Sequence, residues 1–152
     1  MTIDPTDSFM DLAIEQANLA LAAGDYPIGA VLVVDGQRFC ARNTRNTGKD
    51  KKAHAEINTL KMAQDFAASK EKTLYVTLQP CTMCAKALMD FGIRQVYFLL
   101  EDPIKGGDMP RVSVMQLDRP EYRRSMVDWL RGNKELYPAY YSYFTSPTFT
   151  EG

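Results

Sequence analysis

The sequence predicts an α/β fold, a three-layer α/β/α sandwich around a mixed central sheet of about five strands. Apolar segments rich in β-branched residues alternate along the chain with segments whose apolar residues recur at helical spacing. This alternation is typical of a sheet covered by helices on both faces. An Asp35-Gly36 turn separates the first two predicted strands, so these two should run antiparallel. The sheet is therefore expected to be mixed.

The first predicted elements are a helix and a hairpin. The helix should begin after Ser8, a candidate N-cap, and end near Gly24. Its apolar face should consist of Met10, Ile14, Ala17 and Leu21. The continuous apolar run 28–34 predicts a buried strand, and 37–41 should return beside it as the second strand.

The central part of the chain is expected to contain a helix, a strand and a further helix. After a polar loop over 43–52, the second helix should carry on one face Ile57, Leu60 and Ala67. Residues 73–78 predict a strand, and 81–91 predict a helix that ends at Gly92.

The last third should add two strands and a helix. Residues 93–100 predict a buried strand, 101–110 a loop, and 111–117 a short fifth strand. Asp118, with Glu121 three residues later, resembles a capping box at the start of the last long helix. The apolar stripe of that helix should be Tyr122, Met126, Trp129 and Leu130.

Length and composition predict a single domain over 1–152, because a chain of 152 residues can bury one sizeable core. Residues 133–152 should form a C-terminal tail dense in aromatic side chains, namely Tyr137, Tyr140, Tyr141, Tyr143 and Phe144. These rings could close over a binding site as a lid, or they could pack the last helix against the fold or a second subunit. The composition leaves both interpretations open.

The charge and the cysteine content indicate which binding partners and which cellular compartment to expect for this protein. A net charge of -1 and a pI near 5.8 give no overall attraction to nucleic acid. Three cysteines, two of them in a C-x-x-C spacing, indicate a reducing compartment and a metal or redox role. The sequence shows no secretory signal pattern and no apolar run near the roughly 20 residues that span a bilayer. We therefore expect a cytoplasmic protein with no membrane partner.

The strongest functional signal is H-A-E at 54–56 followed by P-C-T-M-C at 80–84. His54, the only histidine, joins Cys81 and Cys84 as three good zinc ligands, whereas structural zinc sites are closed by four. The two cysteines stand three apart at a predicted helix start, where they share a face and where the helix dipole favours thiolates. The pattern predicts one catalytic zinc ion per chain with an open coordination position.

Glu56 is the predicted catalytic acid and base. It follows His54 by two residues, about 200° around the helix axis, and so should not share the coordination direction of His54. Two thiolates offset the charge of Zn²⁺, so a nearby base is needed to complete the deprotonation of its water. The predicted reaction is hydrolytic deamination: zinc-bound hydroxide attacks a ring carbon that bears an amine, Glu56 shuttles the protons, and ammonia leaves.

These motifs, in this order, form the signature of the zinc deaminases. The chain resembles the cytidine deaminase-like superfamily, in particular the branch that holds tRNA adenosine deaminases, yeast-type cytosine deaminases and guanine deaminases. The resemblance is carried by 26–30 (YPIGA), 54–57, 73–78 and 80–84, and it fades after the fourth strand. It implies the cytidine deaminase-like fold and the deamination of an amino-bearing nucleobase, nucleoside or nucleotide.

The resemblance also implies individual roles. His54, Cys81 and Cys84 would hold zinc, and Glu56 would be the proton shuttle. The residues expected to contact the substrate are Asn43, Ile28 and Ala55. The resemblance further implies a homodimer with the active site near the subunit interface.

The chain also departs from these relatives. Gln79 stands where tRNA adenosine deaminases typically carry glutamate, and the basic C-terminal helix of many of them is missing. The tail offers tyrosines but no aspartate beyond Asp128, unlike yeast-type cytosine deaminases. Together with the acidic pI, these departures favour a small-molecule nucleobase or nucleoside as the substrate. The alternatives are tRNA-specific adenosine-to-inosine deamination and, in another class, a non-catalytic structural zinc or binding subunit.

Two further features have alternative interpretations. Cys40 would close the zinc site if it reached the metal, but a lone cysteine on a predicted strand is usually a small buried hydrophobe. The segment 42–52 carries five basic residues and one acidic residue, namely Arg42, Arg45, Lys49, Lys51, Lys52 and Asp50. It could contact a phosphate or an RNA backbone, or it could be a solvated loop.

Overall fold

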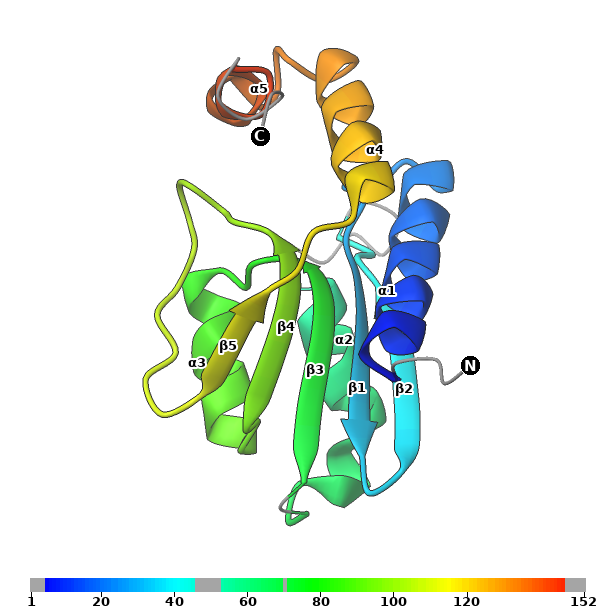
Figure 1. Ribbon diagram of the computed structural model, residues 1–152, viewed down its shortest axis with the longest axis vertical. Coiled ribbons are helices and arrows are strands. Elements are labelled where there is room, and N and C mark those ends of the chain that lie inside the picture. Colours follow the sequence, from blue (N-terminus) through cyan, green and yellow to red (C-terminus); the bar gives the residue numbers. More distant parts are fainter. Residues whose placement is uncertain (1–4, 46–52, 70, 147–152) are drawn as a thin grey trace.

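The computed structural model describes residues 5–45, 53–69 and 71–146 (Figure 1). Within these residues five strands form one mixed sheet in the order β2-β1-β3-β4-β5. β1 pairs antiparallel with β2 and β3, whereas the β3–β4 and β4–β5 pairs are parallel. The strands are β1 Gly29–Val34, β2 Gln37–Arg42, β3 Lys72–Leu78, β4 Gln95–Leu100 and β5 Ser113–Gln116. The predicted mixed sheet is confirmed.

Helices cover both faces of the sheet, with α1 on one face and α2 and α3 on the other (Figure 1). α4 and α5 lie beyond the ends at which β3 and β4 finish (Figure 1). The helices are α1 Pro5–Ala22, α2 Ala55–Met62, the 3₁₀ turn η1 Gln64–Phe66, α3 Thr82–Phe91, α4 Pro120–Arg131 and α5 Pro138–Phe144. The three-layer α/β/α architecture is therefore as predicted.

Two hydrophobic clusters fill the spaces between the layers. Val31 faces the cluster shared with α1, α4 and α5, whereas its neighbour Leu32 faces the cluster shared with α2 and α3. On β3, Tyr75 likewise faces the cluster shared with α1, α4 and α5, and Leu74 faces the cluster shared with α2 and α3. Side chains of successive strand residues point to opposite faces, so these continuous apolar strands are buried on both sides.

The predicted hairpin is confirmed, with Val34 paired to Gln37 across a turn that has positive φ at both Asp35 (48°) and Gly36 (79°). These angles are those of a type I′ turn, whose twist matches that of paired strands. The helix stop at Gly24 is also confirmed. Its φ is +87°, which glycine adopts readily, and the next residue donates its N–H back into the last turn of α1.

α1 begins earlier than predicted and buries a different face. It starts at Pro5 rather than after Ser8, as suits a proline in the first turn of a helix. The residues with no exposed surface are Met10, Ala13, Ala17 and Ala20, whereas Ile14 and Leu21 are only half-buried. The alanines allow α1 to lie close to β1. A side chain carbon on Gly29 would stand 2.0 Å from the Ala13 carbonyl oxygen.

Two other sequence predictions about helices were wrong. α2 ends at Met62, before Ala67, and its buried residues are Ala55, Glu56 and Thr59 rather than the predicted apolar stripe. α4 has no capping box, because Pro120 opens the helix and Arg119 is its N-cap. The remaining predicted residue of the box, Glu121, accepts a hydrogen bond from Arg119 Nε at 2.6 Å.

The residues described include no helix that is both long and apolar enough to cross a membrane.

The close approach of α1 to β1 predicts a strong effect of Gly29→Ala. The added carbon would overlap backbone atoms of α1, which cannot move aside as a flexible side chain would. The free energy of unfolding should fall by at least about 2 kcal/mol in denaturant titrations. Gly132→Ala is the matched control, because its φ is -81° and the nearest atom would lie 3.6 Å away. Equal stability of the two variants would contradict this packing.

Candidate active site

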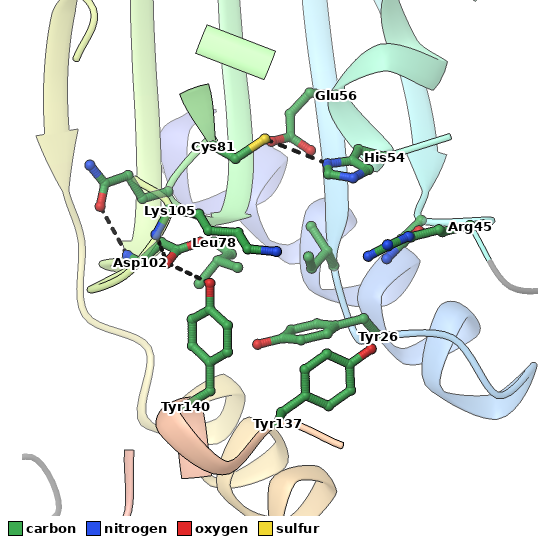
Figure 2. Close-up of a pocket in the computed structure, with 13 residues that line it drawn as sticks. Tyr26, Arg45, His54, Glu56, Leu78, Cys81, Asp102, Lys105, Tyr137 and Tyr140 are labelled. Atoms are coloured by element: carbon green, nitrogen blue, oxygen red, sulfur yellow. Dashed lines mark hydrogen bonds between the residues drawn. The ribbon is translucent and has the colours of Figure 1, made fainter. Parts of the chain in front are cut away.

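A cavity opens where β3 and β4 end, and its walls come from segments far apart in the sequence (Figure 2). His54, Glu56 and Cys81 line it on one side. In open α/β sheets, ligands commonly bind beyond the carboxyl ends of the strands. The predicted metal motif therefore lies at the position where this architecture places a binding site.

Two helix starts supply the metal motif. His54 is the N-cap of α2 and Cys81 is the N-cap of α3, both with extended backbone angles. Neither side chain caps its own helix, although an N-cap side chain usually does so. Cys84 lies in the first turn of α3 and is fully buried. The side chains of His54, Cys81 and Cys84 can therefore approach one another, as ligands of one metal ion must.

The positions of the three side chains fit a zinc ion. One ligand atom from each of His54, Cys81 and Cys84 lies within 4.8 Å of the others. His54 Nδ1 is 3.8 Å from Cys81 Sγ and 3.4 Å from Cys84 Sγ. Tetrahedral zinc, with bonds of about 2.0–2.1 Å to nitrogen and about 2.3 Å to sulfur, separates such atoms by about 3.6 Å. The donors are therefore already spaced for the metal.

The Glu56 carboxylate lies beside this group and is almost completely buried, with 4% of its surface exposed. Burial raises the pKa of the Glu56 carboxyl to about 7. Its Oε1 is a buried oxygen with no hydrogen-bond partner among the described residues. A carboxyl group with a pKa near neutrality can both accept and donate a proton at pH 7.

The two cysteines differ in their protonation. A hydrogen bond from the Cys84 thiol lowers the pKa of Cys81 to about 3, with His54 contributing in the same direction. The same contact raises the pKa of Cys84. Cys81 is therefore a thiolate at neutral pH, which is the form that binds metals.

The structure brings two of the three predicted substrate residues to the cavity. Asn43 and Ile28 line it, and the backbone N–H of Asn43 donates to the Ile28 carbonyl at 3.0 Å. Asn43 Oδ1 accepts the N–H of Arg45 at 2.9 Å, which leaves the side-chain amide nitrogen as a donor. Ala55 is fully buried in the core and is not among the residues that line the cavity. Its substrate contact stays a prediction.

The loop that follows β4, which carries Gly106 and Gly107, forms a second wall of the cavity, although Asp102 and Lys105 were not among the predicted site residues. Asp102 and Lys105 line the cavity, and Asp102 Oδ1 accepts the backbone N–H groups of Ile104 (3.0 Å) and Lys105 (2.8 Å). The loop is joined to the metal motif by an antiparallel bridge between Cys81 and Gly106. The position of Asp102 just after a buried parallel strand was a usable signal, because such positions meet at one edge of the sheet.

Aromatic residues close the far side of the cavity. Tyr137 and Tyr140 come from the C-terminal tail and Tyr26 from the segment before β1 (Figure 2). Tyr140 and Phe144 also belong to the core cluster around α4. The tail therefore packs against the last long helix and also lines the cavity, whereas its closing as a lid over a substrate stays a prediction. Residues 147–152 of the tail lie outside the described residues.

Cys40 does not close the metal site. It is half-buried on β2, packs against the core, and is absent from the group of potential metal ligands among the described residues. In the basic segment, Arg42 lies 4.0 Å from the buried carboxylate of Asp25, and Arg45 lines the cavity. The other charged residues of that segment, Lys49, Asp50, Lys51 and Lys52, lie outside the described residues.

A three-donor metal site with a buried carboxylate beside it, at the edge of a mixed α/β sheet, is the arrangement of a metal-dependent hydrolase. A family model described as the cytidine and deoxycytidylate deaminase zinc-binding region matches residues 4–100. The chain belongs to this family. It is a hydrolase that acts on the C–N bond of a nucleobase or nucleoside, and zinc is its cofactor.

Curated relatives include tRNA-specific adenosine deaminases. That of Agrobacterium fabrum is 47% identical over 105 residues, which cover 65% of this chain and 67% of the relative. That of Bacillus subtilis is 35% identical over 123 residues, covering 78% and 76%.

Solved structures show the same fold. A tRNA:A34 deaminase studied for A-to-I editing at the wobble position of transfer RNA superposes with a TM-score of 0.66 and 34% identity. The match covers 75% of this chain and 100% of that one. The guanine deaminase of Nitrosomonas europaea has a TM-score of 0.62 at 20% identity, over 76% and 78% of the two chains. This second likeness concerns the fold alone.

Glu56→Gln should retain zinc and lose at least about 10²-fold in turnover, because the amide cannot carry protons. Zinc content by elemental analysis and ammonia release from any substrate of the wild type check this. Cys40→Ser is the control and should keep both zinc and turnover. Near-normal turnover of the Glu56 variant, or loss of zinc from the Cys40 variant, would refute these assignments.

Proposed function

We propose that this chain deaminates adenosine to inosine in tRNA. The observation that carries the proposal is the similarity to tRNA-specific adenosine deaminases, which extends over 78% of the chain for the Bacillus subtilis enzyme. The similarity to a tRNA:A34 deaminase structure, at 34% identity, supports the same substrate. The sequence alone favoured a small-molecule nucleobase or nucleoside as the substrate. On the strength of these similarities, we now place adenosine in tRNA first.

Two cations at the cavity support an RNA substrate. Figure 2 shows the side chains of Arg45 and Lys105 directed into the cavity from opposite walls. A phosphate of the RNA backbone could be held by such groups, and their effect is local. The net charge of -1 for the whole chain therefore says little about the charge that a substrate meets at this site.

In this proposal His54, Cys81 and Cys84 hold zinc, and Glu56 moves the protons. Zinc, when bound, supplies the acidity that makes water a nucleophile at neutral pH. Glu56 Oε1, a buried oxygen with no partner among the described residues, takes one proton from the attacking water and passes it to the ring nitrogen. A second proton, from the hydroxyl added to the ring carbon, then passes through Glu56 to the departing amine, and ammonia leaves as the carbonyl forms. Asn43 and Ile28 hold the base at the cavity wall.

A free nucleobase or nucleoside remains the second candidate substrate, and one observation favours it. Tyr137 and Tyr140, from the tail, form part of the cavity wall. Rings in this position enclose a small base well, since any base offers a face for stacking. The homodimer and the cytoplasmic location expected from the sequence stay predictions.

Ammonia release should be measured from an anticodon hairpin with adenosine at the wobble position, and from free adenosine, adenine, guanine and cytosine. We expect kcat/KM for the hairpin to exceed that for every free compound by at least about 100-fold, because remote contacts contribute transition-state binding. The advantage should shrink as salt rises. A hairpin with guanosine at the same position is the control and should release no ammonia. Turnover of a free base alone would reject the tRNA substrate.

A further inference from the structure

Two buried side-chain polar atoms lack a hydrogen-bond partner among the described residues, and both belong to residues that line the cavity. One is Oε1 of Glu56, which the proposed proton transfers use. The other is the hydroxyl of Tyr26, which nothing described so far uses. Buried polar groups in folded proteins are nearly always paired, so an unpaired one at a binding cavity calls for a physical reason.

The protein holds the Tyr26 ring firmly in place. The ring centroid lies 4.5 Å from that of Trp129 and 5.4 Å from that of Tyr137, the latter edge to face. The backbone beside it is fixed as well, because the Tyr122 hydroxyl donates to the Pro27 carbonyl at 2.5 Å. The Tyr26 hydroxyl therefore cannot turn to solvent to find a partner.

The nearby carboxylate of Asp102 is bonded to another tyrosine. Asp102 Oδ1 accepts the hydroxyl of Tyr140 at 2.8 Å in addition to two backbone N–H groups. Three donors already occupy this oxygen. Asp102 thus bonds the tail tyrosine Tyr140, whereas the Tyr26 hydroxyl has no partner among the described residues.

We propose that the Tyr26 hydroxyl is a specificity residue that hydrogen-bonds an oxygen in the sugar–phosphate part of the substrate. Figure 2 shows this hydroxyl on the opposite side of the cavity from Glu56 and Cys81, so it faces the end of the substrate that does not react. Lys105, directed into the same space, favours an electron-rich oxygen there. A neutral hydroxyl can donate to a phosphate oxygen, and it can donate to or accept from a sugar hydroxyl.

The test compares Tyr26→Phe with the wild type on the anticodon hairpin. The ring and its aromatic contacts remain, so only the hydroxyl is lost. KM should rise about 3- to 10-fold while kcat changes little, as expected for one neutral hydrogen bond that holds substrate and transition state equally. In the absence of substrate the melting temperature should not fall, because no bond within the protein is broken.

Tyr122→Phe is the matched control for stability, since its hydroxyl is buried nearby but bonded to Pro27. That variant should melt about 2–6 °C lower than the wild type. If Tyr26→Phe also melts lower and leaves KM unchanged, an ordered water or packing accounts for the hydroxyl and the proposal is overturned.

A hairpin with 2′-deoxyadenosine at the reacting position separates the possible oxygens. If Tyr26→Phe raises KM for the adenosine hairpin but not for the 2′-deoxyadenosine hairpin, the partner of the Tyr26 hydroxyl is the sugar 2′-hydroxyl. If the variant raises KM equally for both hairpins, the partner is another oxygen of the sugar–phosphate part. Either result supports the proposal.

The inference rests on the proposed function for the identity of its substrate, but the two can fail separately. If the wild type deaminates the hairpin and Tyr26→Phe does so with unchanged KM, only the role of Tyr26 fails. If the wild type acts on nucleosides but not on the hairpin, the tRNA substrate fails, and the same comparison on nucleosides decides the role of Tyr26. Turnover of free bases alone overturns both.

Discussion

The convergence of two helix N-termini on one point is the constraint on which the rest of the site depends. His54 and Cys81 occupy positions where a helix normally has a side chain that caps its own backbone, yet neither makes that bond. Their side chains face each other instead, with His54 Nδ1 3.8 Å from Cys81 Sγ. The helix dipoles at both starts favour the anionic sulfurs that a metal requires.

The sheet and the loop after β4 hold this convergence in place. β1 lies between β2 and β3, and the backbone N–H of Thr44, just after β2, donates to the carbonyl of Ala53, just before α2. The bridge between Cys81 and Gly106 then ties the start of α3 to the loop that carries Asp102. Glycine is needed there, because a side chain carbon on Gly106 would stand 2.7 Å from the Asp102 carbonyl oxygen. The start of α3, which carries two of the predicted metal ligands, is thus linked through the backbone to the loop that lines the cavity.

Most of the fold and the whole metal motif could be predicted from the sequence, because their signals are local. The Asp35-Gly36 turn and the H-A-E and P-C-T-M-C motifs each lie within a few residues. The errors arose where tertiary packing determines burial. Alanines as well as Met10 form the buried face of α1, and the charged residue Glu56 is buried on α2 beside the metal motif. Tyr26, Asp102 and Lys105 escaped prediction as cavity residues because they come from separate loops that only the folded chain brings together.

In the proposed function, the reaction and the choice of substrate depend on different parts of the chain. The paired helix starts would carry the chemistry, and the loops and the tail, which lines the cavity with Tyr137 and Tyr140, would carry recognition. The most direct test of the central claim is a crystal structure with anomalous diffraction at the zinc edge. It should show one zinc ion per chain about 2.0–2.3 Å from His54 Nδ1 and from the sulfurs of Cys81 and Cys84, with Glu56 nearby but not bound to it. Zinc coordinated by Cys40 or Glu56 as a fourth protein ligand, or absent from these three residues, would contradict the account.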